Sequence, residues 1–309
     1  MKKAIFIMSL DCEGKWGMAD LSMEHREGLT NKRLNDAYIN LTKLLKLYQI
    51  KSTFAFVGAF TMTKSEFKNR QDWFLDTPID GNGWLDNFKK DIKVNQYDGW
   101  FNPEALDIVR SSNSHEVASH GFTHLPLTKS LISKESFLQE MNRMQQIMQL
   151  KDLNVRTFVY PRNIVGYPSE LKFFGIEGYR MDLFQNYKRF LKKPKGLLNE
   201  INIFQSAQNH SMLEEIIKIP SGYFLNWRSH LRQKIPISIS TKRWKHLIKN
   251  AIKNKKVIHL WTHPHNFITG DQQFTLLENI LQMIDEAKKD DKIEILTQLE
   301  YCRFISENT

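Results

Sequence analysis

The segment Ala4–Glu13, AIFIMSLDCE, leads from a run of apolar residues directly into two carboxylates. A continuous apolar run such as Ala4–Leu10 is typical of a strand that is covered on both faces, as in the parallel sheets of α/β proteins. Successive side chains of a strand point to opposite faces, so Asp11 and Glu13 should point the same way and Cys12 the other. Carboxylates at such a place can simply form a turn or cap a helix. Because active sites of α/β folds gather at the carboxyl ends of strands, we favour a functional role for both acids.

Strands and helices are predicted to alternate along the rest of the chain. The expected strands after the first are residues 51–57, 115–119, 155–160, 175–180, 215–220, 256–261 and 292–296. The expected helices are residues 31–48, 102–110, 133–150, 167–174, 240–254 and 272–289. This order predicts a parallel βα array of the α/β class. The sequence has no internal repeat and no long linker, so we expect a single domain over residues 1–309.

Polar residues follow four of the predicted strands at the point where each strand ends. They are Asp11 and Glu13, then His120 and His124, then Arg162, and finally His263 and His265. In a closed or nearly closed βα barrel these positions share one face. A single histidine is more often structural than catalytic, but the coincidence at four strand ends favours a common site. Imidazole is the commonest metal ligand in proteins, so this site is a candidate metal centre.

Residues 58–101 form a long connection that is rich in aromatic side chains. A connection of this length is uncommon unless it is functional or carries its own structure. We expect most of its rings to form a small satellite core. Trp84 follows Gly81, Asn82 and Gly83, and we expect its ring to be exposed and to contact a substrate.

The positive charge of the chain is concentrated in one region. The net charge is +10, and residues 186–256 contain 16 Lys or Arg against 3 Asp or Glu, so the rest of the chain is net acidic. A solvated surface is one explanation of such a region. The other is a docking surface for an acidic partner, such as a phosphate-bearing substrate or an anionic membrane. Nucleic acid is disfavoured, because no nucleic-acid-binding motif accompanies the charge.

The cysteine content and the N-terminal sequence predict the compartment. The only cysteines are Cys12 and Cys302, which excludes a disulfide framework and fits a reducing compartment. The apolar run from Ala4 is short and meets Asp11 without a cleavage site of small residues, so we do not expect a signal peptide. No run reaches the about 18 apolar residues of a membrane-spanning helix. We therefore expect a cytoplasmic protein.

Four motifs together resemble the polysaccharide deacetylase family, which shares the NodB homology domain and is classed with the family 4 carbohydrate esterases. They are Ser9–Glu13, Ser119–His124, Tyr160–Asn163 and Leu260–Pro264. In this order they are similar to the family's opening aspartate motif, its His-x-x-x-His pair, its Arg/Pro motif and its late Leu-His motif. The resemblance covers nearly the whole chain, from residue 4 to about residue 300.

The resemblance implies a distorted (β/α)7 barrel that binds a divalent metal, usually zinc and in some members cobalt or manganese. It implies Glu13, His120 and His124 as the metal ligands. Many members carry two adjacent aspartates in the first motif. Here Cys12 separates Asp11 from Glu13, which is similar to a subgroup whose acids are one residue apart.

The resemblance also implies catalytic roles. Asp11 is expected to be the general base and His263 the general acid, while Arg162 is expected to orient Asp11 and to keep it ionised. The remaining candidates are expected to contact substrate, and these are His265, Asn266, Trp84, Pro161 and Asn163.

The activity implied is hydrolysis of an N-acetyl or O-acetyl group of a sugar. Nucleotide-linked and lipid-linked N-acetyl sugars both carry pyrophosphate and fit the basic region, which favours a step in cell-surface polysaccharide or O-antigen synthesis at the inner membrane face. Two alternatives remain open. One is a hydrolase of the same fold that cleaves another C–N bond, in a cyclic amide or ureide, without metal. The other is a non-catalytic barrel that binds carbohydrate or lipid. The sequence does not determine the oligomeric state.

Overall fold

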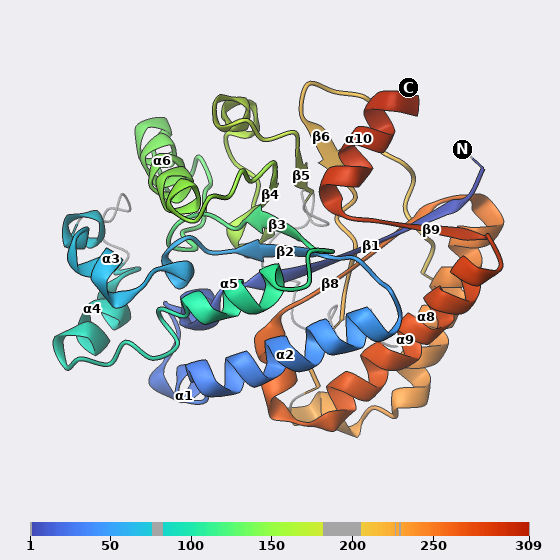
Figure 1. Cartoon of the computed structure of the whole chain (residues 1–309), viewed down its shortest axis with the longest axis horizontal. Coiled ribbons are helices and arrows are strands. Elements are labelled where there is room, and N and C mark those ends of the chain that lie inside the picture. Colours follow the sequence, from blue (N-terminus) through green and yellow to red (C-terminus); the bar gives the residue numbers. More distant parts are fainter. Residues whose placement is uncertain (1, 76–82, 182–204, 226, 229, 309) are drawn as a thin grey trace.

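The computed structural model describes residues 2–75, 83–181, 205–225, 227–228 and 230–308. In this part of the chain nine parallel strands form one curled sheet, with helices packed around it (Figure 1). The strands are β1 (Ala4–Cys12), β2 (Thr53–Phe56), β3 (Glu116–Ser119), β4 (Thr157–Val159), β5 (Gly178–Arg180), β6 (Ile217–Ile219), β7 (Tyr223–Phe224), β8 (Val257–Thr262) and β9 (Ile293–Leu296). Their order is β6-β5-β4-β3-β2-β1-β8-β7, with β9 beside β1. The predicted fold, a distorted (β/α)7 barrel in a single domain, is confirmed.

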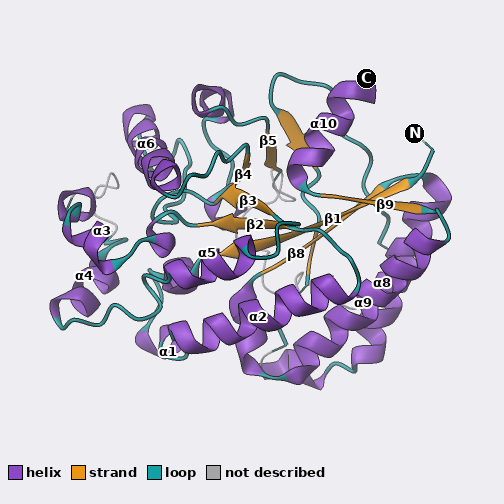
Figure 2. Ribbon diagram, viewed as in Figure 1, coloured by secondary structure: helices purple, strands orange, loops and turns teal. Residues whose placement is uncertain are grey.

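The helices of the described residues lie around the strands (Figure 2). They are α1 (Met23–Arg26), α2 (Asn31–Leu47), α3 (Lys64–Lys68), α4 (Asp86–Lys93), α5 (Pro103–Arg110), α6 (Lys134–Leu150), α8 (Ile237–Asn254), α9 (Asp271–Lys289) and α10 (Gln298–Asn308). Local sequence explains where they begin. The Ser133 hydroxyl caps α6 by accepting a hydrogen bond from the Ser136 N–H, and Pro103 occupies the first turn of α5. In the described part of the chain, no helix combines the length and the apolar character needed to cross a membrane.

β1 is the central strand of the sheet, and both of its edges are paired. One edge pairs with β8 over Ile5–Leu10. The other edge is divided between two strands, because β9 pairs with Ala4–Ile7 and β2 with Ser9–Cys12. This central place explains why every residue of β1 is buried, as its apolar sequence predicts.

The two faces of β1 have different neighbours. The face toward the helices carries Phe6, Met8, Leu10 and Cys12, which belong to the main apolar core. The opposite face carries Ile5, Ile7, Ser9 and Asp11. Ile5 and Ile7 pack with residues of β6, β8 and α10 in a separate apolar cluster inside the barrel. The barrel interior therefore changes from apolar to polar toward the carboxyl end of β1, and Cys12 points away from it as predicted.

Most rings of the aromatic connection are buried, but the prediction of a separate satellite core is wrong, because these rings belong to the main apolar core. The short helices of this connection surround the ring of Trp16, whose centroid lies 4.8 Å from that of Phe88, 4.9 Å from that of Trp100 and 6.0 Å from that of Phe74. The prediction that Trp84 is exposed is wrong, because its side chain is buried and only 5% exposed. Its indole Nε1 donates a hydrogen bond to the Thr123 carbonyl at 3.0 Å, so packing against a distant loop covers the ring.

Five of the described α-helices and strands are absent from the sequence prediction. They are the short helices α1, α3 and α4, the two-residue strand β7, and α10 at the C-terminal end. Of the predicted basic region, residues 186–204 lie outside the described residues.

Candidate active site

Arg180, the last residue of β5, holds Asp11. The two carboxylate oxygens of Asp11 accept hydrogen bonds from the two terminal guanidinium nitrogens at 2.8 and 2.6 Å. Asp11 is 2% exposed and Arg180 is 1% exposed. Arg180 also donates to Oδ1 of Asn163 at 2.7 Å and lies over the ring of Trp261, 4.4 Å from its centroid. This two-point contact fixes the direction of the carboxylate as well as its charge.

A series of buried hydrogen bonds also holds Arg180. The donor and the acceptor of each bond can be assigned. His259 Nδ1 lies 2.6 Å from the Pro220 carbonyl oxygen, which can only accept, so Nδ1 carries the proton. His259 Nε2 therefore accepts from the Ser9 hydroxyl at 2.8 Å, and Ser9 Oγ accepts from Arg180 at 3.1 Å. Burial lowers the pKa of His259 to about 3. The imidazole is therefore neutral, and its Nε2 is free of a proton and can accept from Ser9.

The turn after β3 presents His120 and His124. Gly121 has a positive φ of 76°, which glycine adopts without strain, and His124 has a φ of 58°. Thr123, between them, donates its backbone N–H and its hydroxyl to Oε1 of the buried Glu140 in α6, at 2.6 and 2.7 Å. Two hydrogen bonds therefore tie the turn to α6.

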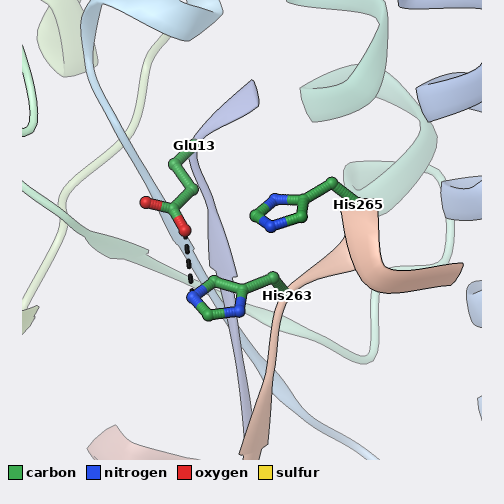
Figure 3. A group of neighbouring side chains, drawn as sticks. All are labelled: Glu13, His263 and His265. Carbon is green, nitrogen blue, oxygen red and sulfur yellow. Dashed lines mark ion pairs between the residues drawn. The ribbon is translucent and has the colours of Figure 1, made fainter. Parts of the chain in front are cut away.

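Glu13 lies among three histidines. Its Oε2 is 2.7 Å from Nε2 of His124 and 3.9 Å from Nε2 of His120. Its Oε1 is 3.0 Å from Nε2 of His263 (Figure 3). The same His263 nitrogen is 3.9 Å from Oδ2 of Asp11. The structure thus brings together the five residues that the sequence marks as base, acid and metal ligands.

The protonation of His120 shows that this cluster suits a cation. His120 Nδ1 lies 2.8 Å from the Val159 carbonyl oxygen and must donate to it. Burial lowers the pKa of His120 to about 4, so the ring is neutral and its Nε2 presents a lone pair toward Glu13. Metal-binding histidines commonly donate their other N–H to a backbone carbonyl in this way. Both distances from Glu13 Oε2 are below about 4.2 Å, twice a typical zinc–nitrogen distance, so one ion could contact all three groups.

Electrostatics set the charge states of the acids and of His263. Burial raises the pKa of Asp11, but the charge and hydrogen bond of Arg180 together with the charges of His120 and His263 outweigh it, and the pKa falls below its ordinary value of 3.8. Burial also opposes ionisation of Glu13, and the charges of His124 and His263 lower its pKa well below 4.5. For His263, burial lowers the pKa, yet the negative charge of Glu13 raises it above 6.5. The site therefore pairs an ionised carboxylate with a protonated imidazole, which is the pairing that acid–base catalysis uses.

The prediction that Arg162 orients Asp11 is wrong. Its guanidinium forms an ion pair with Asp20 and lies over the ring of Trp84, 5.5 Å from the centroid. The cause is the backbone, because Arg162 lies in a turn after β4 with a φ of 60°. Arg180, by contrast, extends from the end of a strand and points into the barrel, where it takes the role predicted for Arg162.

The five residues predicted to contact substrate have different surroundings in the structure. Asn163 accepts a hydrogen bond from Arg180 and so belongs to the support of Asp11. The ring of Trp84 stacks on the imidazole of His124, with centroids 6.2 Å apart. Pro161 is buried. His265 stacks on His263 with centroids 4.8 Å apart, and the Asn266 N–H donates to the His263 carbonyl at 3.0 Å.

Residues 29–168 match the family described as polysaccharide deacetylase, and this range includes His120 and His124. The predicted resemblance to the polysaccharide deacetylase family is confirmed. The match does not extend to Asp11, Glu13 or His263, whose place in the site comes from the structure.

Solved structures extend the likeness of fold beyond the matched range. A Mycobacterium smegmatis protein assigned as a polysaccharide deacetylase is 10% identical, with a TM-score of 0.60 over 99% of this chain and 92% of that chain. An allantoinase is 11% identical, with a TM-score of 0.55 over the same shares of 99% and 92%. No curated protein matches the sequence. At these identities the structures show the fold alone, and the family match together with that fold supports a deacetylase.

Sequence reasoning missed Arg180, Ser9 and His259. Each had a visible signal. Arg180 ends a short predicted strand, and His259 interrupts an otherwise apolar strand, where a polar side chain must find buried partners. Ser9 shares the inward face of β1 with Asp11, two residues away.

Proposed function

We propose that the protein is a metal-dependent hydrolase that removes the N-acetyl or O-acetyl group of a sugar. One observation carries the proposal. Asp11, kept ionised by Arg180, lies 3.9 Å from the protonatable Nε2 of His263, beside a second carboxylate that faces two histidines. A base, an acid and a set of metal ligands in one buried cluster are what hydrolysis of an amide or ester requires.

Glu13, His120 and His124 are the residues that would hold the ion. Two imidazoles and one carboxylate leave coordination positions open, as catalytic zinc sites do. Zinc is the first choice, and cobalt or manganese are alternatives. When bound, such an ion polarises a carbonyl group and makes water more acidic.

The side chains then divide the proton transfers between them. Asp11 accepts the proton of the attacking water, because its low pKa leaves it ionised at neutral pH. His263 donates a proton to the leaving nitrogen or oxygen, because its raised pKa keeps a proton on the ring. Arg180 positions Asp11 and has no proton to give.

The substrate proposed is a nucleotide-linked or lipid-linked N-acetyl sugar in cell-surface polysaccharide or O-antigen synthesis, used at the cytoplasmic face of the membrane. The excess of Lys and Arg over acidic residues in residues 186–256 supports an anionic substrate. His265 and Asn266, which lie next to His263 in the sequence, are the proposed contacts to the sugar.

The test is acetate release from a panel of nucleotide-linked, lipid-linked and free N-acetyl sugars, with and without a chelator. We expect release from at least one substrate, loss of release with chelator, and recovery when zinc is restored. His120→Ala should not be rescued by zinc, whereas His25→Ala, on the exposed helix α1, should behave as the wild type. Full activity in the presence of chelator would instead favour a metal-independent hydrolase of another C–N bond.

A further inference from the structure

The two carboxylate oxygens of Glu13 face different histidines. Oε2 faces His124 at 2.7 Å and His120 at 3.9 Å, whereas Oε1 faces His263 at 3.0 Å. The proposed metal site needs only the first oxygen. The second oxygen and the histidines after β8 are therefore available to form another set of ligands.

His265 completes that second set. Figure 3 shows its imidazole reaching into the space beside Glu13 and His263. The residue is 5% exposed, and its Nδ1 is buried without a hydrogen-bond partner among the described residues. Potential ligand atoms of Glu13, His263 and His265 all lie within 4.8 Å of one another. A buried imidazole nitrogen without a partner costs free energy unless something binds it.

We propose that Glu13, His263 and His265 form a second divalent-cation site, which shares Glu13 with the first. Each site then has two imidazoles and one carboxylate oxygen. Nitrogen ligands of this kind select zinc, cobalt or copper and disfavour magnesium and calcium. The second ion binds more weakly than the first, because the first has already offset the charge of Glu13 and repels another cation nearby.

This site gives the enzyme a means of inhibition by excess metal, and that consequence rests on the proposed function. The Nε2 atom of His263 faces Glu13, and it is the atom that the proposed function assigns to the general acid. A cation held there would occupy the position from which His263 serves the leaving group. The first ion therefore activates the enzyme and the second removes its general acid.

The experiment is a zinc titration of the metal-free full-length protein by equilibrium dialysis, with bound zinc counted by elemental analysis and acetate release measured on the same samples. We expect the wild type to bind two ions per chain. Activity should rise with the first ion and fall about 100-fold as the second site fills, the scale on which general acids act. Magnesium should not cause the fall.

Two variants separate the sites. His265→Leu should bind one ion and show no loss of its own maximal activity in excess zinc. His120→Leu should lose the first ion and keep one, held by Glu13, His263 and His265. His25→Leu is the control for binding to an exposed histidine and should still bind two.

A wild-type protein that saturates at one ion overturns the proposal, as does a His265→Leu variant that still binds two. If His265→Leu binds no zinc, the His120→Leu variant decides between the outcomes. One ion retained by His120→Leu supports the second site, and no retained ion refutes it. Two bound ions without acetate release at any loading would refute the proposed function and leave the second site standing.

Discussion

Replacing Arg180 by methionine tests the central correction, that Arg180 and not Arg162 supports Asp11. The substitution keeps an unbranched side chain of similar length and removes the charge. It leaves the Asp11 carboxylate buried without the two hydrogen bonds at 2.8 and 2.6 Å. Breaking a buried ion pair in this way typically costs about 3–5 kcal/mol, because the remaining charge is uncompensated. Burial should then raise the pKa of Asp11, so that less of the base is ionised at neutral pH.

Arg162→Met is the matched control. Its partner Asp20 is exposed, and exposed ion pairs contribute about 0–1 kcal/mol. The free energies of unfolding of the two variants should therefore differ by several kcal/mol, with unchanged m-values, when urea unfolding is followed by far-ultraviolet circular dichroism. Acetate release should fall strongly in Arg180→Met and stay near the wild-type rate in Arg162→Met.

A second change isolates the charge of Asp11. In the Arg180→Met background, Asp11→Asn removes the unpaired carboxylate and should recover most of the lost stability, although not the activity. The explanation is refuted if Arg180→Met and Arg162→Met lose equal stability, or if Asp11→Asn makes Arg180→Met less stable still.

Three further outcomes are expected. The pH profile of the rate should be bell-shaped, because Asp11 must be deprotonated and His263 protonated; the acid limb should lie below the ordinary aspartate value of 3.8 and the alkaline limb above the ordinary histidine value of 6.5. His259→Leu removes the acceptor of the Ser9 hydroxyl and should lower the turnover rate more than it raises KM, whereas His259→Gln keeps an acceptor and should restore much of the rate; equal effects of the two would contradict the hydrogen-bond chain. Trp84→Ala should destabilise the fold by about 3–5 kcal/mol in urea unfolding, as expected for a buried ring and not for an exposed one.

The sequence predicts the fold from its apolar runs and helical stripes. The run in β1 is long and unbroken, and a strand of that kind requires neighbours on both faces, which leads directly to a parallel sheet. It also predicts which residues meet. Asp11 lies at the end of β1, and His120 and His263 directly follow β3 and β8. The carboxyl ends of parallel strands gather at one face whatever the details of the helices.

The tertiary structure decides which groups touch. Arg162 and Arg180 both lie at carboxyl ends of neighbouring strands, and their residue type does not say which of them reaches Asp11. A left-handed turn directs the first to Asp20, while strand alternation points the second to Asp11. The burial of Trp84 has the same origin, because its cover comes from Thr123 and the turn around it, far along the chain. Periodicity along a chain records which face a residue occupies, but a partner many residues away is selected only when the strands have been packed side by side.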